Sequence, residues 1–346
     1  MDDPRTQVGQ WKPAMYVQGS AALGIATKPP GRQDFDFDVT LEFGSLPAIA
    51  AMAARTAVEK RLREDANYAR MLNTEKNRCL RLDYAKDERF HIDIVVGRSA
   101  TWVNDTGTGI QVTDRQIAEW VCSDPLGFIA WFEKRNRQVM NMFQAQDGGG
   151  TMINASADPA PEQPEPDEKL PLQWVIQIMK RHRDLMFLGN PTGAPISIIL
   201  ATLAAKAYQG EETIEAALFG ITNRLLRQFD DVERRIVLNP VIRDENFADK
   251  WRAKPQRREA FFNWHGRFQE HVRTFIEATK ISSISESLDS LVGVAAKTRA
   301  FSAHAEGLNE MQRRGQLGVI SPAATLAPIT MTGSKVIPPH TNYGSV

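Results

Sequence analysis

The chain has 346 residues, of which 42 are basic and 42 are acidic, so its formal net charge is zero. This balance excludes a global attraction to duplex nucleic acid or to an anionic membrane, and any site for a polyanion has to be local. Two cysteines, Cys79 and Cys122, are too few for a disulfide framework, and the first residues do not resemble a signal peptide. We expect a globular protein of about two domains that acts in the cytoplasm.

Strand-like and helix-like segments alternate through residues 1–145. Apolar residues at every second position predict strands, and apolar residues at helical spacing predict helices. The predicted strands cover residues 35–43, 79–85 and 89–97, and the predicted helices cover about 46–66 and 113–143. This mixture is typical of an α/β or α+β domain.

The composition changes at residues 146–169, where glycines, prolines and acidic residues leave little to bury. Such a segment is typical of a linker or an exposed loop, so we place a domain boundary there. Residues 170–301 then read almost entirely as helix. The most apolar stretch, 194–208, is shorter than the ~20 residues of a membrane span and predicts a buried helix. Residues 302–346 lack periodicity and predict a flexible, partly disordered tail.

Three aspartates, Asp34, Asp36 and Asp38, alternate with apolar residues in the first predicted strand. Strand geometry projects all three carboxylates from one face, where like charges repel each other. In a half-buried strand, uncompensated carboxylates are driven toward protonation, so a bound cation is the expected compensation. A solvated edge strand is the alternative explanation.

A later predicted strand carries His91 and Asp93 on one face. Two carboxylates on one strand and one on another suit two-metal phosphoryl transfer, in which carboxylates hold two Mg²⁺ ions about 4 Å apart. The Gly19–Ser20 turn before the first acidic strand offers backbone N–H groups and a hydroxyl to phosphate oxygens. His91 has the parity to point toward the metals. We expect it to be a hydrogen-bonded neighbour rather than a metal ligand, because Mg²⁺ prefers oxygen ligands.

These motifs resemble the signature of the polymerase-beta-like nucleotidyltransferases, a glycine-serine turn, two spaced acids and a later acid. More narrowly, the chain resembles the CD-NTase family, bacterial cyclic oligonucleotide synthases of anti-phage defence related to cyclic GMP-AMP synthase and oligoadenylate synthase. Four later segments also resemble blocks of this family, at residues 113–132, 172–184, 195–210 and 239–251. The resemblance implies an α+β nucleotidyltransferase core with a mixed sheet in 1–145, followed by a helical substrate-binding domain in 170–301.

The resemblance assigns catalytic and metal-binding roles to Asp36, Asp38 and Asp93, with two Mg²⁺ ions as cofactors and Mn²⁺ as a substitute. Asp34 is then an extra acid, either an alternative ligand or a solvated residue at the start of the strand.

The resemblance also assigns nucleotide binding. Gly19 and Ser20 match the phosphate-binding turn, and Lys180 and Ser197 match second-domain positions that contact the triphosphate in similar enzymes. Without the resemblance, Lys180 would be read as part of a charged helix face.

The implied activity joins nucleoside triphosphates, with ATP as the first candidate and GTP or others as further candidates, into a cyclic oligonucleotide second messenger and releases pyrophosphate. Two alternatives stay open: a non-cyclising nucleotidyltransferase acting on RNA or protein, and an inactive nucleotide-binding module. The tail is a candidate handle for an operon-encoded regulator or a conjugating enzyme. Neither a membrane nor duplex nucleic acid is a predicted partner.

Overall fold

The computed structural model describes residues 3–28, 30, 35–84, 90–137, 169–243, 245–320, 325–328 and 334–336. Asp34 and nearly all of the predicted linker, 146–169, lie outside these residues. The chain divides into two units, Met1–Glu277 and Ala278–Val346, and each is treated separately below. The first unit holds all the candidate site residues.

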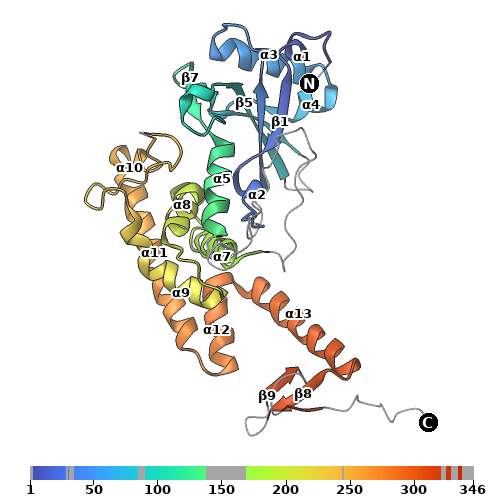
Figure 1. Cartoon of the computed structure of the whole chain (residues 1–346), viewed down its shortest axis with the longest axis vertical. Coiled ribbons are helices and arrows are strands. Elements are labelled where there is room, and N and C mark those ends of the chain that lie inside the picture. The colour runs from blue at the N-terminus through green and yellow to red at the C-terminus, as the bar shows by residue number, and fades with distance from the viewer. Residues whose placement is uncertain are drawn as a thin grey trace, which may run out of the picture. The chain divides into compact units, whose positions relative to one another are not determined.

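A mixed sheet forms the core of the first unit (Figure 1). Its strands β2 and β5 run parallel, whereas every other described pair in this sheet is antiparallel. The main path of the sheet is β1-β2-β5-β4-β3, and β6 pairs with both β5 and β7. The strands are β1 (Pro13–Val17), β2 (Phe35–Phe43), β3 (Leu72–Asn73), β4 (Cys79–Asp83), β5 (Phe90–Ser99), β6 (Ile110–Asp114) and β7 (Glu119–Ser123). The three predicted strands and the α+β class with a mixed sheet are confirmed.

Helix α3 (Ala51–Arg63) packs its apolar stripe against one face of this sheet, next to the short helix α1 (Gln7–Gln10). Alternation in β2 turns Val39, Leu41 and Phe43 into this core, which leaves the aspartates of the same strand on the opposite face. The short helix α4 (Ala66–Met71) follows α3, and α2 (Gly19–Ala22) lies between β1 and β2.

The predicted helix over 113–143 is wrong in its first part. Residues 110–123 form the β6–β7 hairpin, whose turn includes Ala118 at a φ of 56°, and helix α5 (Pro125–Asn136) begins only afterwards. The α5 helix starts where it does because the Asp124 carboxylate accepts the backbone N–H of Gly127 at 2.8 Å. Trp120 and Val121 favour a strand, and cross-strand pairing outweighed the weak helical spacing.

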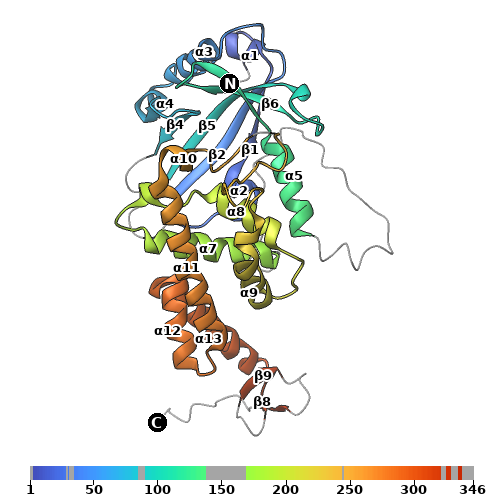
Figure 2. The same cartoon turned by 90° about the vertical axis from the view of Figure 1, so that its left-hand side faces the viewer.

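Helices account for most of residues 170–277, as expected. The α8 helix is almost entirely buried, which confirms the interpretation of its apolar stretch as a core helix. Figures 1 and 2 both show α7 and α8 beside α2, on the side of the sheet where β2 begins. These elements are α7 (Pro171–Met186), α8 (Ser197–Ala207), α9 (Ile214–Arg224), α10 (Lys250–Ala253) and α11 (Pro255–Glu277), with short 3₁₀ turns at Thr101–Val103, Pro191–Gly193 and Leu225–Gln228. None of the helices in the described ranges is long and apolar enough to cross a bilayer.

The second unit contains α12 (Ile281–Val292), α13 (Val294–Arg313) and a small antiparallel sheet. Its strands are β8 (Leu317–Ile320), β9 (Thr325–Pro328) and β10 (Ser334–Val336). Helix α13 continues to Arg313, where the sequence analysis expected an aperiodic tail from residue 302. No residue of α13 is buried, so the helix has no buried apolar stripe of the kind that helical periodicity detects. Good helix formers such as Ala, Glu, Met and Arg favour the helix here.

Candidate active site

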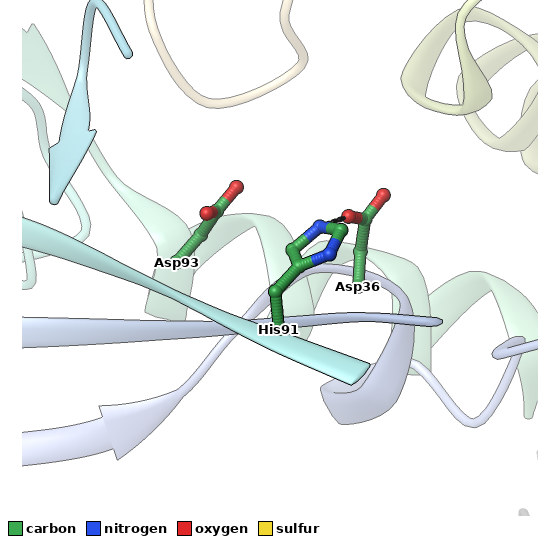
Figure 3. A group of neighbouring side chains, drawn as sticks. All are labelled: Asp36, His91 and Asp93. Atoms are coloured by element: carbon green, nitrogen blue, oxygen red, sulfur yellow. Dashed lines mark ion pairs between the residues drawn. The ribbon is translucent and has the colours of Figure 1, made fainter. Parts of the chain in front are cut away.

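The parallel pairing of β2 and β5 brings the acidic residues together. In this register Asp38 stands opposite Asp93, and Asp36 stands opposite His91. Figure 3 shows the side chains of Asp36, His91 and Asp93 rising from the same side of the sheet. One ligand atom from each of these three residues lies within 4.8 Å of the others. The group of possible metal ligands thus consists of Asp36, His91 and Asp93, and the strand register sets Asp38, the remaining predicted catalytic aspartate, opposite Asp93.

The carboxylates differ in their exposure and in their charge environment. The Asp36 side chain is 61% exposed, whereas that of Asp93 is only 13% exposed. Burial raises the pKa of the Asp38 carboxyl to about 7, and the negative charges of Asp93 and Asp36 add to the effect. The raised pKa of Asp38 thus agrees with the mutual repulsion that the spacing of the aspartates predicted.

Arg81 partly offsets this negative charge. It lies on β4, directly opposite Asp93 in the antiparallel register with β5. Its Nε and Nη2 atoms donate to the two carboxylate oxygens of Asp93 at 2.6 and 2.7 Å, and Nη2 also reaches Asp36 at 3.5 Å. The sequence analysis missed Arg81, although its parity with Cys79 and Asp83 on β4 was a usable signal that it shares a sheet face with the site.

His91 is buried, and its Nε2 atom contacts the Asp36 carboxylate. The dashed line in Figure 3 marks this pair. A carboxylate that accepts from one imidazole nitrogen orients the ring. His91 therefore lies beside the acidic residues and is itself one of the three residues whose atoms could hold a metal ion, so its role as a neighbour rather than a ligand stays a prediction.

The Gly19–Ser20 turn lies against Asp38. Gly19 has a φ of +64°, and a Cβ placed on it would lie 2.4 Å from Asp38 Oδ2. The backbone N–H of Gln18 also donates to the backbone oxygen of Asp38 at 2.9 Å. Glycine is required here for two reasons, the left-handed backbone and the close approach of the carboxylate. The predicted phosphate-binding turn and the predicted catalytic residues are thus in direct contact.

One face of α7 holds the segment that follows this turn. Four side chains recur at helical spacing on this face, and each donates a hydrogen bond to a backbone carbonyl within residues 23–28. They are Gln173, Gln177, Lys180 and Arg181. The donor–acceptor distances are 3.0 Å to Leu23, 2.8 Å to Ala26, 2.9 Å to Ile25 and 3.3 Å to Lys28, respectively. The two glutamines were not predicted as site residues, because amides on a helix carry no signal without the segment they contact.

The buried Lys180 ammonium interacts with the loop and with the acidic residues. Its Nζ atom donates to the Ile25 carbonyl, and burial, aided by the positive charge of Arg183, lowers its pKa to about 8. Asp184, Asp36 and Asp38 oppose this shift because their negative charges favour the protonated amine. The structure therefore places Lys180 within electrostatic reach of two of the predicted catalytic aspartates.

Ser197 is the first residue of α8 and has a different neighbourhood. Its Oγ accepts a hydrogen bond from Arg183 Nη1 at 2.8 Å, and the same nitrogen donates to the Pro195 carbonyl at 3.1 Å. Within the described ranges, no hydrogen bond joins Ser197 to the three aspartates. Ser197 is thus connected to α7 rather than to the acidic face of the sheet.

The acidic face suits a divalent metal ion. Carboxylate oxygens are the hard ligands that Mg²⁺ and Mn²⁺ prefer, and three carboxylates converge here from two adjacent strands. Burial and the negative charges of Asp93 and Asp36 raise the pKa of Asp38, while the positive charges of Arg81 and Lys180 oppose this shift. The residues present therefore fit a divalent cation.

Comparison with known proteins agrees with this geometry. The family model described as cyclic GMP-AMP synthase DncV-like, nucleotidyltransferase domain, matches residues 13–96. A c-di-GMP synthase of Roseivirga ehrenbergii is 31% identical over 350 residues, which cover 99% of this chain and 88% of the relative. The cyclic dinucleotide synthase CdnG of Bradyrhizobium diazoefficiens is 23% identical over 365 residues, covering 95% of this chain and 83% of the relative.

Solved structures show the same fold. The Bradyrhizobium diazoefficiens CD-NTase CdnG in complex with GTP has a TM-score of 0.65 at 19% identity and covers 88% of this chain and 89% of its own. The Vibrio cholerae DncV cyclic AMP-GMP synthase with nonhydrolyzable GTP has a TM-score of 0.58 at 17% identity, covering 85% and 72%. Because similarity to the Roseivirga enzyme extends over nearly the whole of both sequences, the chain belongs to the CD-NTase family of nucleotidyltransferases.

Proposed function

We propose that this protein converts nucleoside triphosphates into a cyclic dinucleotide and releases pyrophosphate. The observation that carries the proposal is the placement of Asp36, Asp38 and Asp93 on two paired strands, with the Gly19 backbone against Asp38. In each step a 3′-hydroxyl oxygen forms a bond to an α-phosphorus, the bond to the pyrophosphate leaving group breaks, and the hydroxyl proton is lost. A second step of the same kind within the linear product closes the ring.

Asp36, Asp38 and Asp93 would hold two Mg²⁺ ions, with Mn²⁺ as a substitute. When bound, these ions supply positive charge to the triphosphate and lower the pKa of the attacking hydroxyl. The Gly19–Ser20 turn binds phosphate oxygens through backbone N–H groups, which glycine allows to approach closely. Gln173, Gln177 and Lys180 act on the same turn indirectly, because they fix the backbone that follows it.

GTP is the first substrate to test. The Roseivirga relative is a c-di-GMP synthase, and the solved CdnG structure is a complex with GTP. We extend this preference to the present chain as part of the proposal, with ATP as the second candidate. We further propose that the product serves as a second messenger in anti-phage signalling in the cytoplasm.

The test is an incubation of the purified protein with Mg²⁺ and with GTP, ATP or both, followed by phosphatase digestion and mass spectrometry. A phosphatase-resistant product with the mass of a cyclic dinucleotide supports the proposal. A phosphatase-sensitive linear product would instead favour the non-cyclising nucleotidyltransferase. Triphosphate binding without pyrophosphate release would indicate an inactive nucleotide-binding module.

Ser197 and the C-terminal segment remain separate proposals. Ser197 would contact the triphosphate from α8, and its bond to Arg183 would hold it in place. The C-terminal tail, 302–346, would form a handle for an operon-encoded regulator or a conjugating enzyme through its last ten residues, 337–346. Deletion of these ten residues should then leave synthesis by the purified protein unchanged, whereas conjugation to the C-terminus should be lost.

A further inference from the structure

We propose that Arg81 is a resident counter-cation that a divalent metal has to displace from Asp93 and Asp36 in order to bind. This inference rests on the proposed metal site, and it assigns a role to a residue outside the family signature. Arg81 would be a positioning residue, since it acts on the carboxylates rather than on the substrate.

The first observation is the geometry of the pair. The strand register sets Arg81 directly opposite Asp93, and the guanidinium binds both carboxylate oxygens in a bidentate manner at 2.6 and 2.7 Å. A third contact, at 3.5 Å, joins it to Asp36. Bidentate pairs of this kind are strong and directional. The guanidinium therefore bridges two of the three carboxylates that would hold the metal.

The second observation is the burial of the pair. The side chains of Arg81 and Asp93 are 16% and 13% exposed, so water screens their interaction only weakly. Arg81 is anchored by its neighbours on β4, Leu80 and Leu82, which are buried in the core below the sheet. Because a guanidinium stays charged throughout the accessible pH range, its positive charge is permanent. A divalent cation bound to Asp93 would meet this charge at short range.

The third observation concerns the other nearby cation. Lys180 Nζ already donates to the Ile25 carbonyl and is held on α7, whereas Arg81 makes direct ion pairs with the site. Among the described residues, Arg81 is thus the permanently charged cation that pairs with carboxylates of the site, beside His91, which contacts Asp36. The expected consequence is a site that binds a free divalent cation weakly, because each binding event has to break a charge-assisted pair.

The test uses Mn²⁺ alone as the probe, with electron paramagnetic resonance to measure the free ion during a titration of the full chain. Arg81→Ala should bind Mn²⁺ about tenfold more tightly than the wild-type protein, a difference of about 1.4 kcal/mol. Arg81→Lys keeps the positive charge but loses the bidentate contact, so its Mn²⁺ affinity should fall between those of the wild type and Arg81→Ala. Arg115→Ala is the matched control, since Arg115 pairs with Glu75 at an exposed site and its loss changes net charge equally.

A merely structural ion pair would give the opposite result. Removal of a structural arginine leaves Asp93 disordered, so Mn²⁺ affinity equal to or weaker than wild type in folded Arg81→Ala would overturn the inference. Asp93→Ala separates this failure from that of the proposed function. If wild-type protein bound Mn²⁺ no better than Asp93→Ala, both the metal site and the inference built on it would be wrong.

A second measurement does not depend on the stability of Arg81→Ala. The Arg81 Nε–Hε signal can be assigned in a ¹⁵N spectrum of the wild-type protein by its absence from Arg81→Lys. Addition of Mg²⁺ should shift this signal and speed its exchange with water, because the Nε–H loses its bond to Asp93. An unchanged signal at saturating Mg²⁺ would show that the pair survives metal binding and would overturn the inference.

Discussion

Asp38 on β2 and Asp93 on β5 stand directly opposite each other in a parallel register. Two carboxylates in this arrangement repel each other, and burial of Asp38 adds to the cost. The ion pair between Arg81 and Asp93 offsets part of this cost. The acidic residues gathered on this face of the sheet fit a bound divalent cation.

Removal of the acidic pair on β2 should stop synthesis without unfolding the protein. Asp36→Ala combined with Asp38→Ala should lower the rate of pyrophosphate release at least about a hundredfold, because charge stabilisation at the reacting phosphate is lost. In EDTA, the melting temperature should equal or exceed that of the wild type, because the mutual repulsion is relieved. Glu119→Ala, at an exposed position on β7, is the control and should behave as wild type. Synthesis retained by the double variant would contradict the assignment.

The contribution of Asp38 to the stability of the metal-free protein should fall as pH rises from about 4 to about 7. The pKa of Asp38 is about 7 in the folded protein against an ordinary value of 3.8, so within this window the folded state holds a proton that the unfolded chain has released. The stabilising contribution is complete below about pH 4 and is lost as pH rises through about 7. Urea unfolding in EDTA, compared between wild type and Asp38→Asn, measures it. Equal pH slopes for the two proteins would refute the shifted pKa.

Gly19→Ala should disable the site at a modest cost in stability. A Cβ at this position would lie 2.4 Å from Asp38 Oδ2, so the carboxylate has to move, and the φ of +64° is strained for alanine. The backbone strain costs about 1–2 kcal/mol. We expect more than about a tenfold loss of synthesis, because a displacement near the reacting groups affects the transition state directly. Gly107→Ala also has a positive φ but open space around it, so it should lose stability and keep synthesis.

Lys180→Met should destabilise the protein as well as weaken triphosphate binding. Methionine has a similar length but no donor, so the Ile25 carbonyl loses its partner inside the protein at a cost of about 1–3 kcal/mol. Chemical denaturation and titration with a nonhydrolysable triphosphate measure the two effects. Lys254→Met removes an exposed lysine and serves as the control. A variant as stable as wild type would show that the contact with Ile25 contributes nothing.

The sequence by itself determined the local structure and the nature of the site. The period-two pattern fixed which residues of β2 and β5 share a face, and helical spacing located α7 and α8, because side-chain direction follows from backbone geometry alone. Motif order then predicted the chemistry of Asp36, Asp38 and Asp93. The β6–β7 hairpin was not predicted, because cross-strand pairing leaves a weak periodic signal in the sequence. The end of α13 was not predicted either, because a helix favoured by intrinsic propensity also has a weak periodic pattern.

Only the tertiary structure decided how these pieces meet. The register that sets Asp38 opposite Asp93 depends on the pairing of strands that are about 55 residues apart in the chain, and local sequence does not specify such a register. The same holds for Arg81, which became a neighbour of Asp93 through the β4–β5 pairing. Contact of Lys180 with the triphosphate stays a prediction, whereas its hydrogen bond to the Ile25 carbonyl was decided by the fold, because a buried polar group takes whichever partner the packing of distant segments provides.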